Sequence, residues 1–162
     1  MLSLEYILRS CVNNTLDEIL MQQSFAASER GNIMKLAQYT FAFLMGYFMY
    51  SLIEIITRGY THWTMSLTGG AILAILYAIN SHHAMTLIRS CFIGAVIITA
   101  VEFAVGVFDN LIMGWHVWDY SDMPLNVLGQ ICPHFTVYWF LICIPAYYLC
   151  MLIRRRFAQD QV

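Results

Sequence analysis

Residues 90–113 read SCFIGAVIITAVEFAVGVFDNLIM, and this run decides the class of fold. It contains no basic residue and only two acidic ones, Glu102 and Asp109. A helix of about 20 mainly apolar residues is long enough to cross the roughly 30 Å apolar core of a bilayer. The run therefore predicts a transmembrane helix.

Three further apolar runs are long enough to span a bilayer: residues 34–56, 63–80 and 135–153. The run at 63–80 is interrupted by small residues such as Gly69 and Gly70, which let a neighbouring helix approach closely. The composition agrees, because 60% of the chain is apolar and 11% is charged, whereas a soluble domain carries roughly 25% charged residues. We predict an all-α membrane protein with four transmembrane helices.

Basic residues near the spans predict the orientation, because they resist translocation across the membrane. Only Arg58 falls on one side, and the others fall on the opposite side: Arg9, Arg30, Lys35, Arg89, Arg154, Arg155 and Arg156. We therefore expect a multi-pass protein of the cell membrane with both termini in the cytoplasm. The loop at 114–134 then lies outside, with Trp63, Trp115 and Trp118 at the outer interface.

The segment at residues 1–32 predicts an amphipathic helix on the cytoplasmic side. Its apolar residues recur at helical spacing: Leu4, Leu8, Cys11, Val12, Leu16, Ile19 and Leu20. The charged face is net acidic, which favours packing against the bundle or another subunit over docking on anionic lipid. We expect the transmembrane domain at 33–156 and a short cytoplasmic tail at 157–162.

Two pairs of positions suggest that the four spans form two similar hairpins. Gly46 precedes Glu54 by eight residues, and Gly94 precedes Glu102 by eight. The pattern of Gly, aromatic, two residues and Trp occurs at both 59–63 and 114–118. A match this short is also compatible with chance, so both interpretations remain open.

Acidic residues within the spans are the first candidates for function. A charge at the bilayer centre costs at least about 2.5 to 3.5 kcal/mol, so such groups normally face a bundle interior or a wet cavity. Glu102 is either a site for a cation, a proton or a polar substrate, or a protonated side chain that bonds across the bundle. Glu54 precedes Arg58 by four residues, which suits an ion pair, although Arg58 could instead face another acid. Asp109 lies two helical turns, roughly 10 Å, beyond Glu102, which predicts that both acids share one face.

The loop at 114–134 is the densest polar and aromatic segment, and it is too long for a simple turn. We expect a folded cap or a re-entrant segment, with Asp119 or Asn126 bonding to turn amides. Metal ligation would need four residues that have no established ligand spacing, His116, Asp119, Asp122 and His134. We therefore expect no metal or other cofactor. The five cysteines form no CxxC pair and are interpreted as packing residues.

The loop and its flanks resemble the type IV, CmpB-like family of ABC-transporter permeases, a group of small bacterial membrane proteins. The resemblance rests on Trp118-Asp119-Tyr120-Ser121, Pro124-Leu125-Asn126, Gly129-Gln130-Ile131-Cys132, Glu102-Phe103 and Glu54. It covers about residues 41–148 and implies a transport role with no named substrate. The sequence contains no GxxxxGK[ST] motif, so the resemblance implies that any ATPase is a separate chain.

These features favour a permease-like or channel-like transport subunit with an outward-facing acidic site. Its candidate residues are Glu54, Arg58, Glu102, Asp109, Asp119, Tyr120, Asn126 and Gln130. A non-catalytic membrane adaptor or assembly protein is the second hypothesis. A membrane enzyme acting on a lipid or cell-wall precursor through Asp119, Asp122 or His116 is the third. The expected partners are the bilayer and either further copies of the chain or another membrane subunit. A net charge of −2 gives no nucleic-acid footprint.

Overall fold

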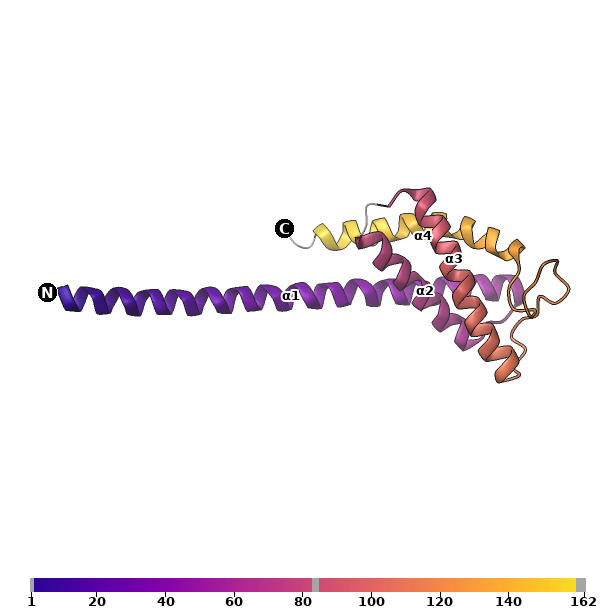
Figure 1. The fold of residues 1–162 in the computed structure, drawn as a ribbon, viewed down its shortest axis with the longest axis horizontal. Helices are drawn as coiled ribbons and strands as arrows, with labels where there is room; N and C mark the ends of the chain where they lie inside the picture. Colours follow the sequence, from indigo (N-terminus) through magenta and orange to yellow (C-terminus); the bar gives the residue numbers. More distant parts are fainter. Residues whose placement is uncertain (1, 83–84, 160–162) are drawn as a thin grey trace. The chain divides into compact units, whose positions relative to one another are not determined.

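The computed structural model describes the backbone of residues 2–82 and 85–159, and it is helical outside the loops (Figure 1). The elements are α1 (Leu2–Arg58), α2 (Trp63–His82), α3 (Leu87–Gly106), the π-helix η1 (Val107–Ile112) and α4 (Pro133–Gln159). No strand is found among these residues, only an isolated bridge between Val127 and Ile131. The predicted all-α class is confirmed.

Within the part of the chain that the structure describes, four helices are long and apolar enough to cross a membrane, which confirms the predicted number of spans. They are Leu16–Arg58, Trp63–Ser81, Leu87–Ile112 and Pro133–Phe157. The third consists of α3 and η1 together. Each run of apolar residues therefore corresponds to one helix, with ends that differ from the predicted ones by a few residues, except at the start of the first.

The first span and the predicted N-terminal helix form a single element, because α1 runs for 57 residues without a break. Gly31 is the one strong helix breaker near the expected boundary at residues 32 and 33, and one glycine costs only about 1 kcal/mol in a helix. The chain divides into two units, residues 1–37 and residues 38–162. The first unit contains only the N-terminal part of α1. The second contains the rest of α1 and the other described elements. The predicted tail begins within α4, and residues 160–162 lie outside the described residues.

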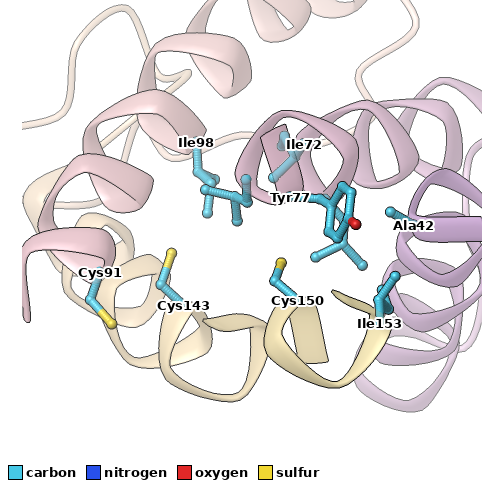
Figure 2. Packing of buried hydrophobic residues seen from close by; sticks show 10 residues of the cluster. Ala42, Ile72, Tyr77, Cys91, Ile98, Cys143, Cys150 and Ile153 are labelled. Atoms are coloured by element: carbon cyan, nitrogen blue, oxygen red, sulfur yellow. The ribbon is translucent and has the colours of Figure 1, made fainter. Parts of the chain in front are cut away.

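The core of the second unit is formed by apolar side chains from all four long helices (Figure 2). Its buried members are Ala42, Ile72, Leu73, Leu76, Tyr77, Cys91, Ile98, Cys143, Cys150 and Ile153. Three of these are cysteines, which pack here as small apolar residues. The cysteine interpretation is confirmed for these three side chains.

Glycines bring the helices of this unit close together. A Cβ atom placed on Gly46 of α1 would lie 2.7 Å from Leu73 Cβ of α2 and would also collide with the carbonyl oxygen of Gly69. A Cβ atom on Gly94 of α3 would lie 2.5 Å from Cys143 Sγ of α4. The predicted role of the small residues in the second span, which is to admit a neighbouring helix, is confirmed for Gly69.

A second cluster covers one end of the bundle and consists of buried Met65, Val117, Trp118 and Tyr120. Trp118 is 6% exposed, and its indole N–H donates to the carbonyl of Gln130 at 3.0 Å. Trp118 is therefore packed within the loop itself. Trp63 and Trp115 are more open, with 57% and 39% of their surface exposed. The expected position of the three rings at the outer membrane interface stays a prediction.

Candidate functional site

Glu102 is buried in α3 and both of its carboxyl oxygens are bonded. Tyr120 of the loop donates its hydroxyl to Oε1 at 3.2 Å, and Trp139 of α4 donates its indole N–H to Oε2 at 2.6 Å. Burial, and then the charge of Glu102, raise the pKa of the Tyr120 hydroxyl, so this group stays protonated and can donate. The carboxyl thus joins α3 to the loop and to α4.

Glu54 and Arg58 form the predicted ion pair near the end of α1. Arg58 Nη1 lies 3.4 Å from Glu54 Oε1, and it also donates to the carbonyl of Val117 at 3.2 Å. The other oxygen, Glu54 Oε2, accepts the hydroxyl of Thr61 at 2.7 Å. The sequence left the partner of Arg58 open, and the structure pairs it with Glu54 and with the loop.

This ion pair lies in a cleft of about 400 Å³ between α1, α4 and the loop, which we call the aromatic cleft. Its lining residues are Tyr50, Ile53, Glu54, Thr57, Arg58, Tyr120, Phe135, Tyr138, Trp139 and Ile142. The rings of Tyr120 and Phe135 stack with centroids 4.3 Å apart, and those of Tyr50 and Trp139 stack at 6.5 Å. Tyr120 and Trp139 therefore form the wall of the cleft and also bond the carboxyl of Glu102.

Asp109 is fully buried in η1 and has different neighbours. Thr64 donates its hydroxyl to Asp109 Oδ2 at 2.6 Å, and His62 Nδ1 lies 2.6 Å from the same hydroxyl oxygen. Because a threonine hydroxyl has only one proton to donate, His62 must donate from Nδ1 in this chain of bonds. Asp109 Oδ1 has no hydrogen-bond partner among the described residues.

Glu102 and Asp109, the two acids of the third span, bond to different elements, although their spacing predicts a shared face. Glu102 bonds to the loop and α4, whereas Asp109 bonds to α2. Between them the helix changes to the π form, in which Met113 N–H donates to the carbonyl of Phe108 at 2.9 Å, five residues back. This wider turn alters the direction of the residues that follow Gly106.

The loop is a folded cap that its own polar side chains hold together. Asn126 donates to the carbonyls of Ser121 and Met123 at 3.0 and 2.8 Å and accepts the amide of Gly129 at 3.0 Å. Asp119 accepts the amide of Ser121 at 2.8 Å and also its hydroxyl. The Ser121 hydroxyl and then its amide lower the pKa of Asp119. The predicted bonding of Asp119 and Asn126 to turn amides is confirmed.

Gln130 attaches the cap to the bundle through Asn110 of η1. Asn110 Nδ2 donates to Gln130 Oε1 at 2.7 Å and to the carbonyl of Trp118 at 3.0 Å. Asn110 Oδ1 accepts the amide of Val117 at 2.6 Å. Gly106 makes this approach possible, because a Cβ atom there would lie 2.7 Å from Gln130 Oε1.

The eight candidate residues therefore form three groups. The first group belongs to the aromatic cleft: Glu54, Arg58 and Tyr120 line it, and Glu102 bonds to Tyr120 of its wall. Asp109 lies in a separate chain of bonds, and the remaining three, Asp119, Asn126 and Gln130, fold or attach the cap. Across the described residues, no three His, Cys, Asp or Glu side chains gather closely enough to hold a metal.

Apart from Arg58, the sequence did not identify the residues that surround the acids. Tyr50 precedes Glu54 by four residues, a helical spacing that could have indicated a shared face. Thr61, His62 and Thr64 form a polar group at the start of the second span, which is a weaker signal. Trp139 carries no local signal, because only the tertiary fold brings it to Glu102.

Residues 63–160, more than half of the chain, match the family described as "Putative ABC-transporter type IV". The chain belongs to this family. The match runs from the second span through the cap to the fourth, and it includes Glu102, Asp109 and the loop motif. Glu54 and Arg58 precede the matched residues. No curated protein and no solved structure matches the chain significantly. The family and the four apolar helices make this an ABC-transporter-related multi-pass membrane protein.

Proposed function

We propose that the chain is a permease-like subunit of a transport system and that the aromatic cleft is its substrate site. The observation that carries this proposal is the construction of the cleft wall. Tyr120 and Trp139, which line the cleft, are also the donors to the buried carboxyl of Glu102. A ligand that displaces either ring would break a bond to Glu102 and so change how α3, α4 and the cap are joined.

The separation of the acids favours a binding cleft over a channel lined by a row of carboxylates. Glu54 bonds to Arg58 and Thr61, Glu102 to two aromatic donors, and Asp109 to a threonine. A channel would need these groups to face a common wet path. The cleft instead has one polar end, formed by Glu54 and Arg58, and aromatic side chains line much of the rest.

The charge distribution and the family support the membrane setting and the partners that we propose. With Lys and Arg concentrated at the ends that carry the termini, both termini lie in the cytoplasm and the cleft faces outward in the cell membrane. Four spans form a thin bundle, so a transport path needs further copies of the chain or another membrane subunit. Energy would come from a separate ATPase, as the family description suggests.

A genetic complementation experiment tests the transport role. Cells that lack the chain are compared by mass spectrometry with cells that regain either the wild type or the double variant E54Q/R58Q. The double variant removes both charges of the cleft together, so no buried charge is left without its partner. The matched control is R155Q, which neutralises an exposed arginine far along α4.

We expect the loss of the chain to change the distribution of at least one compound between cells and medium. Wild type and R155Q should restore that distribution, and E54Q/R58Q should not. A distribution that does not change when the chain is lost would count against transport. Restoration by the double variant would remove the cleft from the mechanism.

One observation favours an adaptor or assembly role as a second candidate. The unit at residues 1–37 exposes large apolar side chains, among them Leu16, Leu20, Met21 and Phe25, at 55 to 67%. Such a surface is typical of a contact with another protein or with a membrane. If polar substitutions at Met21 and Phe25 abolish assembly with a stoichiometric partner while E54Q/R58Q has no effect in cells, the adaptor role is preferred.

A further inference from the structure

A second cavity continues the aromatic cleft along the bundle. This cavity, which we call the apolar groove, also measures about 400 Å³ and lies between α1 and α4 over the surface of α2 and α3. Tyr50, Ile53 and Ile142 line both cavities, so the groove and the cleft meet there. Apart from the shared Tyr50, the lining of the groove is apolar, with residues such as Met45, Met49 and Leu73.

We propose that the groove and the cleft together bind one molecule of an anionic phospholipid, with an acyl chain in the groove and the phosphate at Arg58. This inference rests on the proposed function, because it names the class of ligand that enters the cleft. It commits to a glycerophospholipid, since the groove lies within the spans and is exposed to the bilayer. Met49, Ile53 and Ile142, which line it, are 47%, 40% and 37% exposed.

The apolar part of the site suits a flexible hydrocarbon chain. Methionine side chains adapt their shape to an irregular apolar ligand, and Met45 and Met49 lie side by side along α1. Gly46 and Gly69 leave the groove wall without side chains at the point where α1 crosses α2. On the α4 side the groove is lined in part by the small side chains of Pro145 and Ala146.

The polar part selects an acceptor-rich head group. Both oxygens of Glu54 and both oxygens of Glu102 are already bonded, so the carboxyls have little capacity for a cationic ligand. Arg58 is different: its side chain is 30% exposed and, among the described residues, only its Nη1 atom is bonded. Its Nε and Nη2 groups remain to donate, and guanidinium pairs well with phosphate oxygens. Tyr138, which is 46% exposed, offers a further hydroxyl at the same cleft.

Lipid titration of the purified full-length chain in detergent, followed by native mass spectrometry, tests this site. The probes are phosphatidylglycerol, whose head group is anionic, and phosphatidylcholine, whose head group is zwitterionic, with identical acyl chains so that only the head group differs. The variants are R58K, E54Q/R58Q and A146W, the last of which fills the groove. The controls are R155Q for charge and A100W for bulk, because Ala100 is exposed on α3 and lines neither cavity.

We expect wild type, R155Q and A100W to retain one phosphatidylglycerol in preference to phosphatidylcholine. The affinity of E54Q/R58Q for phosphatidylglycerol should fall about tenfold, which is the effect of one lost charge-assisted bond. R58K should fall less, because it keeps the charge but not the planar fork. A146W should bind neither lipid, and its unfolding midpoint should match that of A100W.

Equal retention of both lipids, or binding that none of the variants changes, overturns the proposal. A change in oligomeric state with A146W and no change in lipid binding also overturns it, because the groove would then be a contact between copies of the chain. Lipid binding is measured without a partner or an energy source, so its failure is separate from a failure of transport. Loss of lipid selectivity with intact transport would leave the proposed function standing.

Discussion

Two substitutions of Glu102, to leucine and to glutamine, separate the hydrogen-bonding role of this carboxyl from its charge. In the wild type the side chain is 4% exposed and accepts one bond from Tyr120 and one from Trp139. Leucine fills a similar volume but accepts no bond. Glutamine keeps the shape and one acceptor oxygen, and it loses the charge.

The structure gives the expected size of each effect. With leucine, the Trp139 N–H and the Tyr120 hydroxyl both lose their acceptor, and each buried unsatisfied group costs about 1 to 3 kcal/mol. E102L should therefore destabilise the bundle by about 2 to 6 kcal/mol. In E102Q the amide oxygen can accept from Trp139, which only donates, and the amide N–H can donate to the hydroxyl oxygen of Tyr120. Because both bonds can be made again, E102Q should cost about 1 kcal/mol or less.

Unfolding by added SDS in mixed micelles, followed by tryptophan fluorescence, measures these costs. A100L serves as the control, since it changes an exposed position of the same helix. If E102L is as stable as A100L, the two bonds contribute nothing and the expected loss is refuted. If E102Q is as unstable as E102L, the charge is essential to the fold and the hydrogen-bonding account is refuted. If E102Q is stable but does not restore transport in cells, the carboxyl has an ionic role in function.

Three other outcomes are expected. D109N should match or exceed the stability of wild type, because Asp109 Oδ1 accepts no bond from any described residue and the amide cannot carry a charge. A loss above about 1 kcal/mol would reveal an unseen donor or cation. In thermal unfolding, G46A should lower the stability by about 1 to 3 kcal/mol, because the added methyl group collides with α2. G31A has open space around it and should raise the stability by up to about 1 kcal/mol. Equal effects of the two variants would contradict the close packing at Gly46. In an NMR titration, S121A should raise the pKa of Asp119, because the Ser121 hydroxyl is one of the groups that lower it. Since the native pKa of Asp119 is depressed, this carboxylate stabilises the fold fully above its unfolded pKa of about 3.9. The stabilisation is lost as the pH falls through the native pKa.

The sequence predicted the helices because each span is a local property. A run of about 20 apolar residues has few alternatives in a bilayer, so the four spans could be placed without tertiary information. The π-helix at Val107–Ile112 could not be placed in this way. Its residues resemble those of an ordinary apolar helix, and the wider turn accompanies the bonds of Asp109 to α2 and Asn110 to the cap. The uninterrupted helix across Gly31 was also missed, since turn signals and tolerated glycines look alike in sequence.

The candidate site was predictable only where its residues are neighbours in the chain. The pairing of Glu54 with Arg58 follows from a spacing of four residues on one helix. The bonding of Asp119 and Asn126 within the cap follows from the turn chemistry of these residues. The bond from Trp139 to Glu102 joins positions 37 residues apart and depends on how α3 packs against α4. Sequence spacing carries no information about such a pair.

The three buried acids differ in how the structure compensates them, and this difference supports the proposal that charge is recognised at the cleft. Glu54 has a cation as its partner and Glu102 has two neutral donors. Asp109 has one neutral donor, and its other oxygen bonds to none of the described residues. In a medium of low dielectric constant a neighbouring opposite charge compensates an ionised group better than neutral donors do. Among the described residues, Arg58 is the only lysine or arginine near this end of the bundle, and it still has unused donors. Under the proposed function, an anionic ligand would therefore interact most favourably beside Arg58, whereas Glu102 and Asp109 are better suited to hold the helices around the cleft in place.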